Sequence, residues 1–139
     1  MKLKIVLDEG AKMPTRAHEA DAGYDLYSRE NAVIFPGHSY SFNTGVHVQV
    51  PRGYGGILVS KSGLNKRYSV QSTGLIDPDY TGSIEVKLYN HGHAAVRIEK
   101  GQKISQMVIV PVITLETEQV DSLEETERGD GGFGSTGKF

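Results

Sequence analysis

The chain has 139 residues, no cysteine and a formal net charge of −2 at pH 7. A chain of this length fits one domain with one hydrophobic core, and the absence of cysteine excludes disulfides and thiolate chemistry. The small net charge provides no basic field for a nucleic acid or a membrane surface. The sequence contains neither the apolar core of a signal peptide nor a transmembrane run. We therefore expect a soluble cytoplasmic protein whose partner is a small molecule.

Short apolar runs recur along the chain between turn residues. In residues 46–50 and 84–88 apolar and polar residues alternate, which predicts strands with one buried face. Proline and glycine mark turns between such runs, for example at residues 36–37 and 100–101. No window sustains helical periodicity, and the best candidate for a brief helical turn is residues 62–67, where Ser62 is a candidate N-cap. The predicted strands are residues 3–7, 32–35, 46–50, 57–60, 84–89, 94–98 and 104–110.

This succession of short strands predicts an all-β fold, a jelly-roll-like sandwich or barrel with one short helical turn. We expect the compact domain to cover residues 1–123. From about residue 124 apolar residues nearly vanish, and the chain continues into the glycine-rich sequence RGDGGFGSTGKF. Glycine is costly to order but lets backbone N–H groups approach an anion closely. We therefore expect residues 124–139 to form a flexible arm that orders as a lid over a bound nucleotide.

Four earlier segments combine residue types that suit phosphate chemistry. Residues 74–82, GLIDPDYTG, place Asp77 at a tight turn, which is either a plain hairpin signal or a rigidly held general base for water. Asp25 ends an extended stretch and is an acid suited to a metal on a triphosphate. Residues 60–64 supply a cation, a hydroxyl and a glycine, as an anion site or a plain loop does. Gln106 interrupts an apolar run and needs a hydrogen-bond partner.

Taken in chain order, five segments resemble the five motifs of the trimeric deoxyuridine triphosphatase (dUTPase) family: the acidic segment that contains Asp25, residues 60–64, residues 74–82, the fourth segment GQKISQM at residues 101–107, and the arm. The resemblance spans residues 21–137, and its most specific parts are GLIDPDYTG and RGDGGFGSTG. It implies a homotrimer of β jelly rolls with shared active sites, which hydrolyses dUTP to dUMP and pyrophosphate with Mg²⁺ and so clears dUTP and supplies the dTTP precursor. Two positions depart from the family pattern, since Lys61 stands where Arg is usual and Gln71 where Asn is common.

The resemblance also implies roles for individual residues. Asp77 would activate the water that attacks the α-phosphorus, and Ser62 and Gln106 would stabilise charge on the phosphates in the transition state. Asp25 would reach the Mg²⁺ ion through water. The ring of Tyr80 would pack against deoxyribose and exclude a 2′-hydroxyl. The other implied substrate contacts are Lys61, Gly63, Gly74, Ile76, Lys87, Arg128, Phe133, Gly134, Ser135 and Thr136.

Three alternatives are compatible with parts of the sequence. A dCTP deaminase would share the fold, but it needs Glu at the position of Lys87 and favours Arg-Ser-Ser at residues 61–63. A non-catalytic module that senses dUTP would keep the pocket and lose turnover, although Asp77 and the arm are intact here. His91 and His93 form a possible metal site, which we interpret as a solvated loop because no cysteine or carboxylate pair accompanies them.

Overall fold

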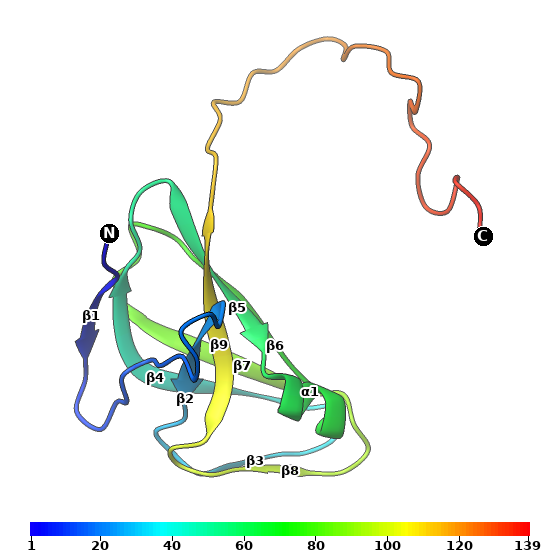
Figure 1. The fold of residues 1–139 in the computed structure, drawn as a ribbon. Helices are drawn as coiled ribbons and strands as arrows, with labels where there is room; N and C mark the ends of the chain where they lie inside the picture. The colour runs from blue at the N-terminus through cyan, green and yellow to red at the C-terminus, as the bar shows by residue number, and fades with distance from the viewer.

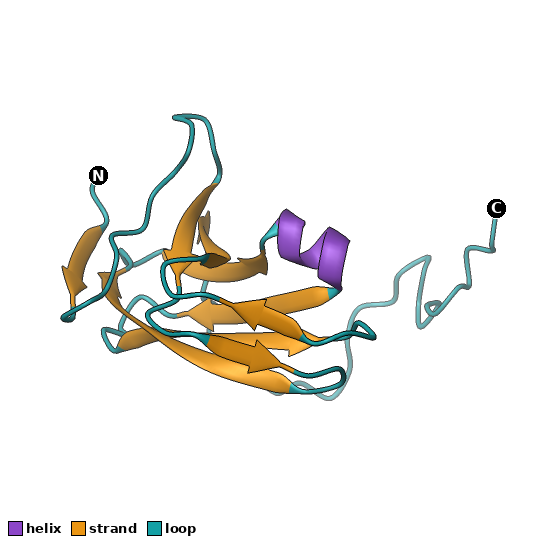
Figure 2. Cartoon of the chain, turned by 90° about the horizontal axis from the view of Figure 1, so that it is seen from below, coloured by secondary structure: helices purple, strands orange, loops and turns teal.

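The computed structural model describes all 139 residues and contains nine strands and one short helix (Figure 1). Seven strands form one antiparallel sheet in the order β1-β4-β7-β6-β5-β9-β2, and β3 pairs with β8. Figure 2 shows the strands lying above one another, with α1 beside them at one end. The predicted jelly-roll-like all-β fold with one helical turn is confirmed. The elements are β1 (Lys4–Leu7), β2 (Gly23–Tyr27), β3 (Ala32–Ile34), β4 (Ser39–Gln49), β5 (Tyr54–Ser60), α1 (Ser62–Tyr68), β6 (Val70–Ile76), β7 (Ser83–Asn90), β8 (Val96–Ile98) and β9 (Lys103–Pro111).

Strand β6 connects the two halves of the large sheet. Its residues 70–72 pair with β7, whereas its residues 73–76 pair with β5. The sheet therefore changes partners within one strand and curls around a core of 17 buried hydrophobic residues. Strand β7 shows the pattern that builds this core, because Ile84, Val86 and Leu88 are at most 1% exposed while Glu85 and Lys87 between them face outward.

Two strands lie where the sequence predicted none or only a fragment. Strand β2 was missed as a regular strand because it does not alternate, and four of its five residues are buried. Strand β6 was missed over most of its length because its polar and glycine residues carry no apolar pattern. Its Gly74 lies so close to β5 that an added Cβ would be 3.0 Å from Leu58 Cδ1. A small residue is needed at this point for the strands to pack.

Strand β4 begins at Ser39, seven residues before the predicted start. A bulge interrupts its pairing with β7, since Asn43 faces Glu85 but the next regular pair is His47 with Ser83. Gly45 in this bulge has a φ of +67°, which few residues other than glycine adopt. The bulge shifts the side-chain alternation, so the sequence pattern indicated only the second half of the strand.

The cap of the helix lies one residue earlier than predicted. Lys61, with an extended backbone, is the N-cap residue, and no side chain caps the helix. The prediction that Ser62 is the cap is therefore wrong, since Ser62 is the first helical residue. Only Leu64 of this helix is buried. The first backbone N–H groups of α1 are left without a capping partner, as at any uncapped N-terminus.

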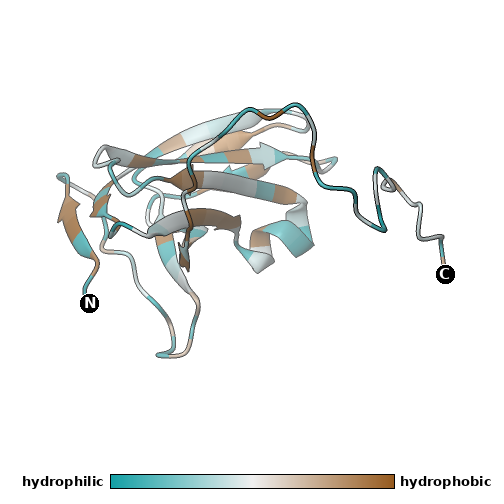
Figure 3. Cartoon of the chain, turned by 90° about the horizontal axis from the view of Figure 1, so that it is seen from above, coloured by the Kyte–Doolittle hydropathy of each residue, from teal (hydrophilic) through white to brown (hydrophobic).

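Regular structure ends at Pro111, where β9 stops. The Val112 N–H still donates to the Gly53 carbonyl oxygen at 2.8 Å, but residues 113–139 form no strand or helix. Figure 1 shows this segment running away from the sheets, and Figure 3 shows that it is mostly hydrophilic while hydrophobic residues gather on the strands. The domain boundary at residue 123 remains a prediction. No helix is long and apolar enough to cross a membrane.

Candidate active site

Asp25 is a buried carboxylate held between two lysines. It lies in β2, is 4% exposed, and has Lys61 Nζ 2.6 Å from its Oδ1 and Lys103 Nζ 2.6 Å from its Oδ2. Burial raises the pKa of Asp25, but the hydrogen bonds and positive charges of Lys103 and Lys61 together lower it below the usual 3.8. The same hydrogen bond and charge raise the pKa of Lys103 above 10.5. Asp25 and Lys103 are therefore both charged at neutral pH.

Gln106 lies directly beside this ion cluster. In the sheet it faces Asp25 on β2 and Val59 on β5, so β9 carries it between the two strands. Its Nε2 donates to the Ser60 carbonyl oxygen at 3.1 Å, which confirms that this buried-run amide has a partner. Its Oε1 lies where a Cβ on Gly23 would be, only 2.5 Å from that position. This hydrogen bond holds the Gln106 amide next to Ser60, the residue that precedes Lys61 and the start of α1.

The first group of predicted site residues therefore comes together at one end of the fold. Lys61, Ser62 and Gly63 follow β5 into α1. Gln106 lies on β9, next to β5 in the sheet, and Asp25 lies on β2, the next strand beyond β9. Ser62 and Gly63 are exposed, and a Cβ added at Gly63 would meet no atom within 4 Å. This end of the fold suits a polyanion, because it presents two ammonium groups, a hydroxyl, an amide and uncapped N–H groups.

The second group lies on the β6–β7 turn. The Tyr80 N–H donates to the Asp77 carbonyl oxygen at 3.1 Å, so the tight turn predicted at residues 77–80 is present. Asp77 is exposed and Tyr80 is 45% exposed. A cavity of about 250 Å³ opens beside them. Its lining residues are Leu75, Ile76, Asp77, Tyr80 and Glu85. The turn therefore presents a carboxylate and an aromatic ring to the same small hollow.

The two groups do not meet within one chain. The helix α1 and the β6–β7 turn lie at opposite ends of β6, as Figure 1 shows. Since β6 has seven residues and a strand rises about 3.3 Å per residue, the ends are about 20 Å apart. Lys87 belongs to neither group, because it lies on the outer face of β7 with its Nζ 5.2 Å from the centre of the Tyr89 ring.

The predicted arm residues form a series of turns that contact neither group. Arg128 Nε donates to the Gly131 carbonyl oxygen at 2.8 Å, within the arm itself. Phe133 is fully exposed and has a φ of +49°, and Gly134, with a φ of +93°, follows it. Ser135 and Thr136 are exposed as well. The predicted uracil and phosphate contacts of the arm thus remain free for a partner outside this domain.

Sequence reasoning missed two residues that contribute to these groups. Lys103 stands in the fourth segment, GQKISQM, but only the pairing of β2 with β9 brings it to Asp25. Glu85 lies in the alternating strand β7 and was expected on a polar face, without a role at the cavity. No three His, Cys, Asp or Glu side chains gather as a metal site, and His91 Nε2 lies 3.1 Å from Gln71 Oε1.

Comparison with known proteins gives one consistent family. The family model for dUTPase matches residues 9–137. The deoxyuridine 5′-triphosphate nucleotidohydrolase of Clostridium tetani is 43% identical over 141 residues, which cover 99% of this chain and 97% of that protein. The Clostridium acetobutylicum enzyme of the same name is 41% identical, with coverage of 99% and 96%.

Solved structures give the same result. A dUTPase of Staphylococcus bacteriophage 80alpha with dUPNHPP superimposes with a TM-score of 0.92 at 35% identity, covering 99% of both chains. A mutant dUTPase from phage phi11 of S. aureus, described for its coordination of a structural Mg(II) ion, gives a TM-score of 0.82 at 31% identity. That match covers 90% of this chain and all of the phage chain.

Proposed function

Because this chain belongs to the dUTPase family and is a dUTP diphosphatase, we propose that Asp77 directs the water that attacks the α-phosphorus of dUTP. The products are dUMP and pyrophosphate. The observation that carries this role is the exposed Asp77 carboxylate on a hydrogen-bonded turn, facing a cavity that it shares with the Tyr80 ring. A carboxylate held in this way can accept a proton from water as the nucleophile attacks.

The pyrimidine and sugar lie against the β6–β7 turn in this proposal. Backbone groups around Gly74 and Ile76 pair with uracil, and the half-exposed Tyr80 ring packs against deoxyribose. Phe133 of the arm stacks over uracil. The complete exposure of this ring in the single chain supports a role outside this domain. Lys87 stands farther along the outer face of β7 and is the weakest of the proposed substrate contacts.

The triphosphate lies at the α1 end of the fold. Ser62, Gly63 and Gln106 provide neutral donors there, and the Lys61 ammonium acts as a point charge, since it lacks the two-pronged donor geometry of arginine. Lys103 adds a second cation at this place. From the arm, Arg128, Gly134, Ser135 and Thr136 complete the phosphate contacts. Donors aimed at the phosphate oxygens stabilise the charge that develops during phosphoryl transfer.

Mg²⁺ is the proposed cofactor, and the residues present fit an ion carried mainly by the substrate. Both Asp25 oxygens already face ammonium groups at 2.6 Å, and no cluster of three metal-binding side chains exists. This donor set suits contact through water rather than a direct coordination cage. When bound, the ion would neutralise charge on the phosphates. Asp25 would orient its water while keeping Lys61 and Lys103 close to the phosphates.

A homotrimer with shared active sites accounts for the separation of the two groups. The β6–β7 turn and α1 lie at opposite ends of β6, which are about 20 Å apart, so in this proposal the turn and the α1 end of one chain do not serve the same α-phosphorus. In a closed assembly, the turn of one copy meets the α1 end of the next, and an arm closes the site. The cysteine-free chain suits the reducing cytoplasm, and its charge of −2 does not favour a nucleic acid partner.

The test is pyrophosphate release from dUTP, UTP, dCTP and dTTP, with and without Mg²⁺, by the wild-type protein and by Asp77→Asn. We expect the wild-type protein to release pyrophosphate only from dUTP and only when Mg²⁺ is present. We expect Asp77→Asn to bind dUTP without turning it over. Ammonia release from dCTP, measured in parallel, would instead indicate a deaminase. An Asp77→Asn variant with wild-type turnover would remove Asp77 from the reaction.

A further inference from the structure

The Tyr80 ring lies folded back on the backbone of its own turn. Its hydroxyl donates to the Ser83 carbonyl oxygen at 2.8 Å. A Cβ added to Gly82 would lie 2.5 Å from the Tyr80 hydroxyl oxygen and 2.6 Å from Cζ, closer than such atoms approach one another. The ring therefore occupies the space that any side chain at position 82 would fill. The φ of Gly82 lies outside the left-handed region, so its backbone conformation is open to other residues. The need for glycine comes from the ring alone.

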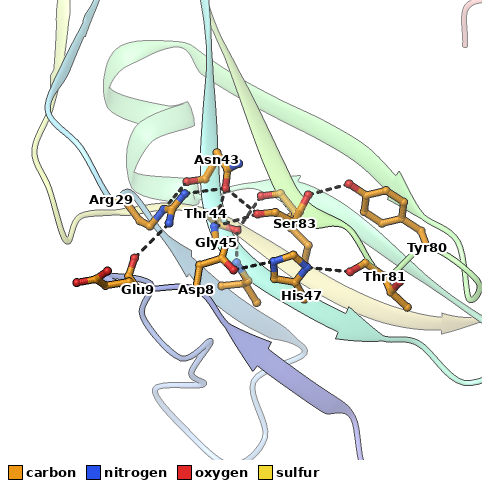
Figure 4. A network of polar contacts seen from close by, with 12 residues as sticks. Asp8, Glu9, Arg29, Asn43, Thr44, Gly45, His47, Tyr80, Thr81 and Ser83 are labelled. Atoms are coloured by element: carbon orange, nitrogen blue, oxygen red, sulfur yellow. Dashed lines mark hydrogen bonds and ion pairs between the residues drawn. The ribbon is translucent and has the colours of Figure 1, made fainter.

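The carbonyl that anchors this ring belongs to a residue that is itself fixed from β4 (Figure 4). Ser83 Oγ donates to Asn43 Oδ1 at 2.7 Å. The same amide oxygen accepts the Gly45 N–H at 2.9 Å and an Arg29 Nη2–H at 3.0 Å. The Asn43 Oδ1 atom thus accepts three hydrogen bonds, and through it Ser83 is linked to the β4 bulge. The anchor of the Tyr80 hydroxyl has little freedom to move.

The other side of Gly82 is fixed as well. His47 Nδ1 lies 2.8 Å from the Thr81 carbonyl oxygen, and its Nε2 lies 3.1 Å from Asp8 Oδ1. Figure 4 shows the contacts of His47 with Thr81 and Asp8 together with the contacts of Ser83. The two neighbours of Gly82 are therefore held by different side chains of β4. The surface against which the Tyr80 ring lies is rigid on both sides.

The structure assigns to Gly82 and Ser83 a positioning role that sets the sugar specificity of the enzyme through the Tyr80 ring. This inference rests on the proposed function, in which Tyr80 packs against deoxyribose. One side of the ring lies on Gly82, and the exposed remainder of the ring is available to the sugar. A methyl group at position 82 would push the ring outward and change the space for a 2′-hydroxyl. Because the ring is the free end of a side chain, it can move without disturbing the sheet.

The experiment compares kcat/KM for dUTP and UTP in wild type, Gly82→Ala and the control Thr81→Ala. The control lies in the same turn and contributes only its backbone carbonyl to the contacts described. We expect Gly82→Ala to lower the ratio of the two kcat/KM values about tenfold or more, because excluding one added hydroxyl depends on an accurately placed wall. Thr81→Ala should keep the wild-type ratio, and both variants should keep the wild-type melting temperature.

A double-mutant cycle with Tyr80→Ala tests whether Gly82 acts through the ring, and the double variant lacks the ring that position 82 would meet. If Gly82 acts through the ring, Gly82→Ala should not change the ratio further in the Tyr80→Ala background. A wild-type ratio in Gly82→Ala, or an equal loss in both backgrounds, would overturn the positioning role. A wild-type protein that hydrolyses UTP as well as dUTP would instead overturn the proposed function of Tyr80 itself.

Discussion

Replacing Asp25 by asparagine would remove the negative charge that both Lys61 and Lys103 contact. The isosteric amide keeps one oxygen acceptor, but its NH₂ group replaces the other oxygen. That oxygen lies 2.6 Å from a lysine Nζ, so the substitution places two donors against each other. Asp25 is 4% exposed, so solvent cannot take over its contacts. The substitution therefore tests how much the buried ion cluster stabilises the junction of β2, β9 and α1.

The expected loss of stability follows from the burial of the three side chains. Removing one partner of a fully buried ion pair costs about 3–5 kcal/mol. Here the Lys61 and Lys103 side chains are 26% and 43% exposed, so both ammonium groups can turn toward water and the loss falls to about 2 kcal/mol. With an unfolding entropy of about 2.1 cal/mol/K per residue, this corresponds to a melting temperature about 7 °C lower for 139 residues.

Urea unfolding at fixed protein concentration measures this loss, with Asp79→Asn as the matched control. The Asp79 side chain is 81% exposed and lies 3.8 Å from Arg52, which is 89% exposed, so its neutralisation should change the free energy of unfolding by less than about 0.5 kcal/mol. The pKa of Asp25 is lowered, so its contribution is present above pH 3.8 and is lost as the pH falls through the folded pKa. The wild type and Asp25→Asn should therefore converge in acid. Equal stability at pH 7, or a gap that widens below pH 3.8, would refute the reasoning.

Three further predictions concern other parts of the chain. Deleting residues from Arg128 onward should leave circular dichroism and oligomeric size unchanged but lower kcat/KM for dUTP about 100-fold, and a fully active truncation would contradict the lid. The backbone carbonyl of Thr81 and the carboxylate of Asp8 raise the pKa of His47 above 6.5, against smaller opposing effects of desolvation and of the Arg29 charge. The stabilising contribution of His47 is therefore complete below pH 6.5 and lost as the pH rises through the folded pKa. In thermal unfolding, His47→Gln should be less stable than wild type at pH 6 and should match wild type at pH 9. Asn90→Ala should lower the free energy of unfolding by about 2–3 kcal/mol, because the buried Asn90 amide donates to two backbone carbonyls at 2.8 and 2.9 Å; a loss under 0.5 kcal/mol in urea unfolding would contradict this.

The sequence was informative where one face of a strand is buried and the strand is regular. Strand β7 alternates over its whole length, and its prediction needed no knowledge of its partners. Strand β2 could not be predicted in this way, because Asp25 lies buried among its apolar residues and is tolerated only through two lysines, one at the start of β9 and one at the N-cap of α1. The β4 bulge at Gly45 likewise has no local signal that distinguishes it from a turn.

The candidate site shows the same division. The types of residue in each segment indicated a carboxylate, a phosphate-binding loop and a lid, and their order indicated the family. The contact of Asp25 with Lys103 depends on the sheet order β5-β9-β2, which pairs segments about 80 residues apart and which no local pattern encodes. The contact of Tyr80 with Gly82 was also missed, since a glycine in a turn is ordinarily explained by the turn itself.

The central claim is that one active site takes Asp77 and the arm from different copies of the chain. Mixing two inactive variants tests it most directly: Asp77→Asn and the chain truncated before Arg128 are co-unfolded, refolded together and assayed for dUTP hydrolysis. The account predicts that activity returns in the mixture, because some mixed assemblies contain a site with an intact Asp77 and an intact arm. A mixture as inactive as either variant alone, although mixed oligomers are present, would contradict it.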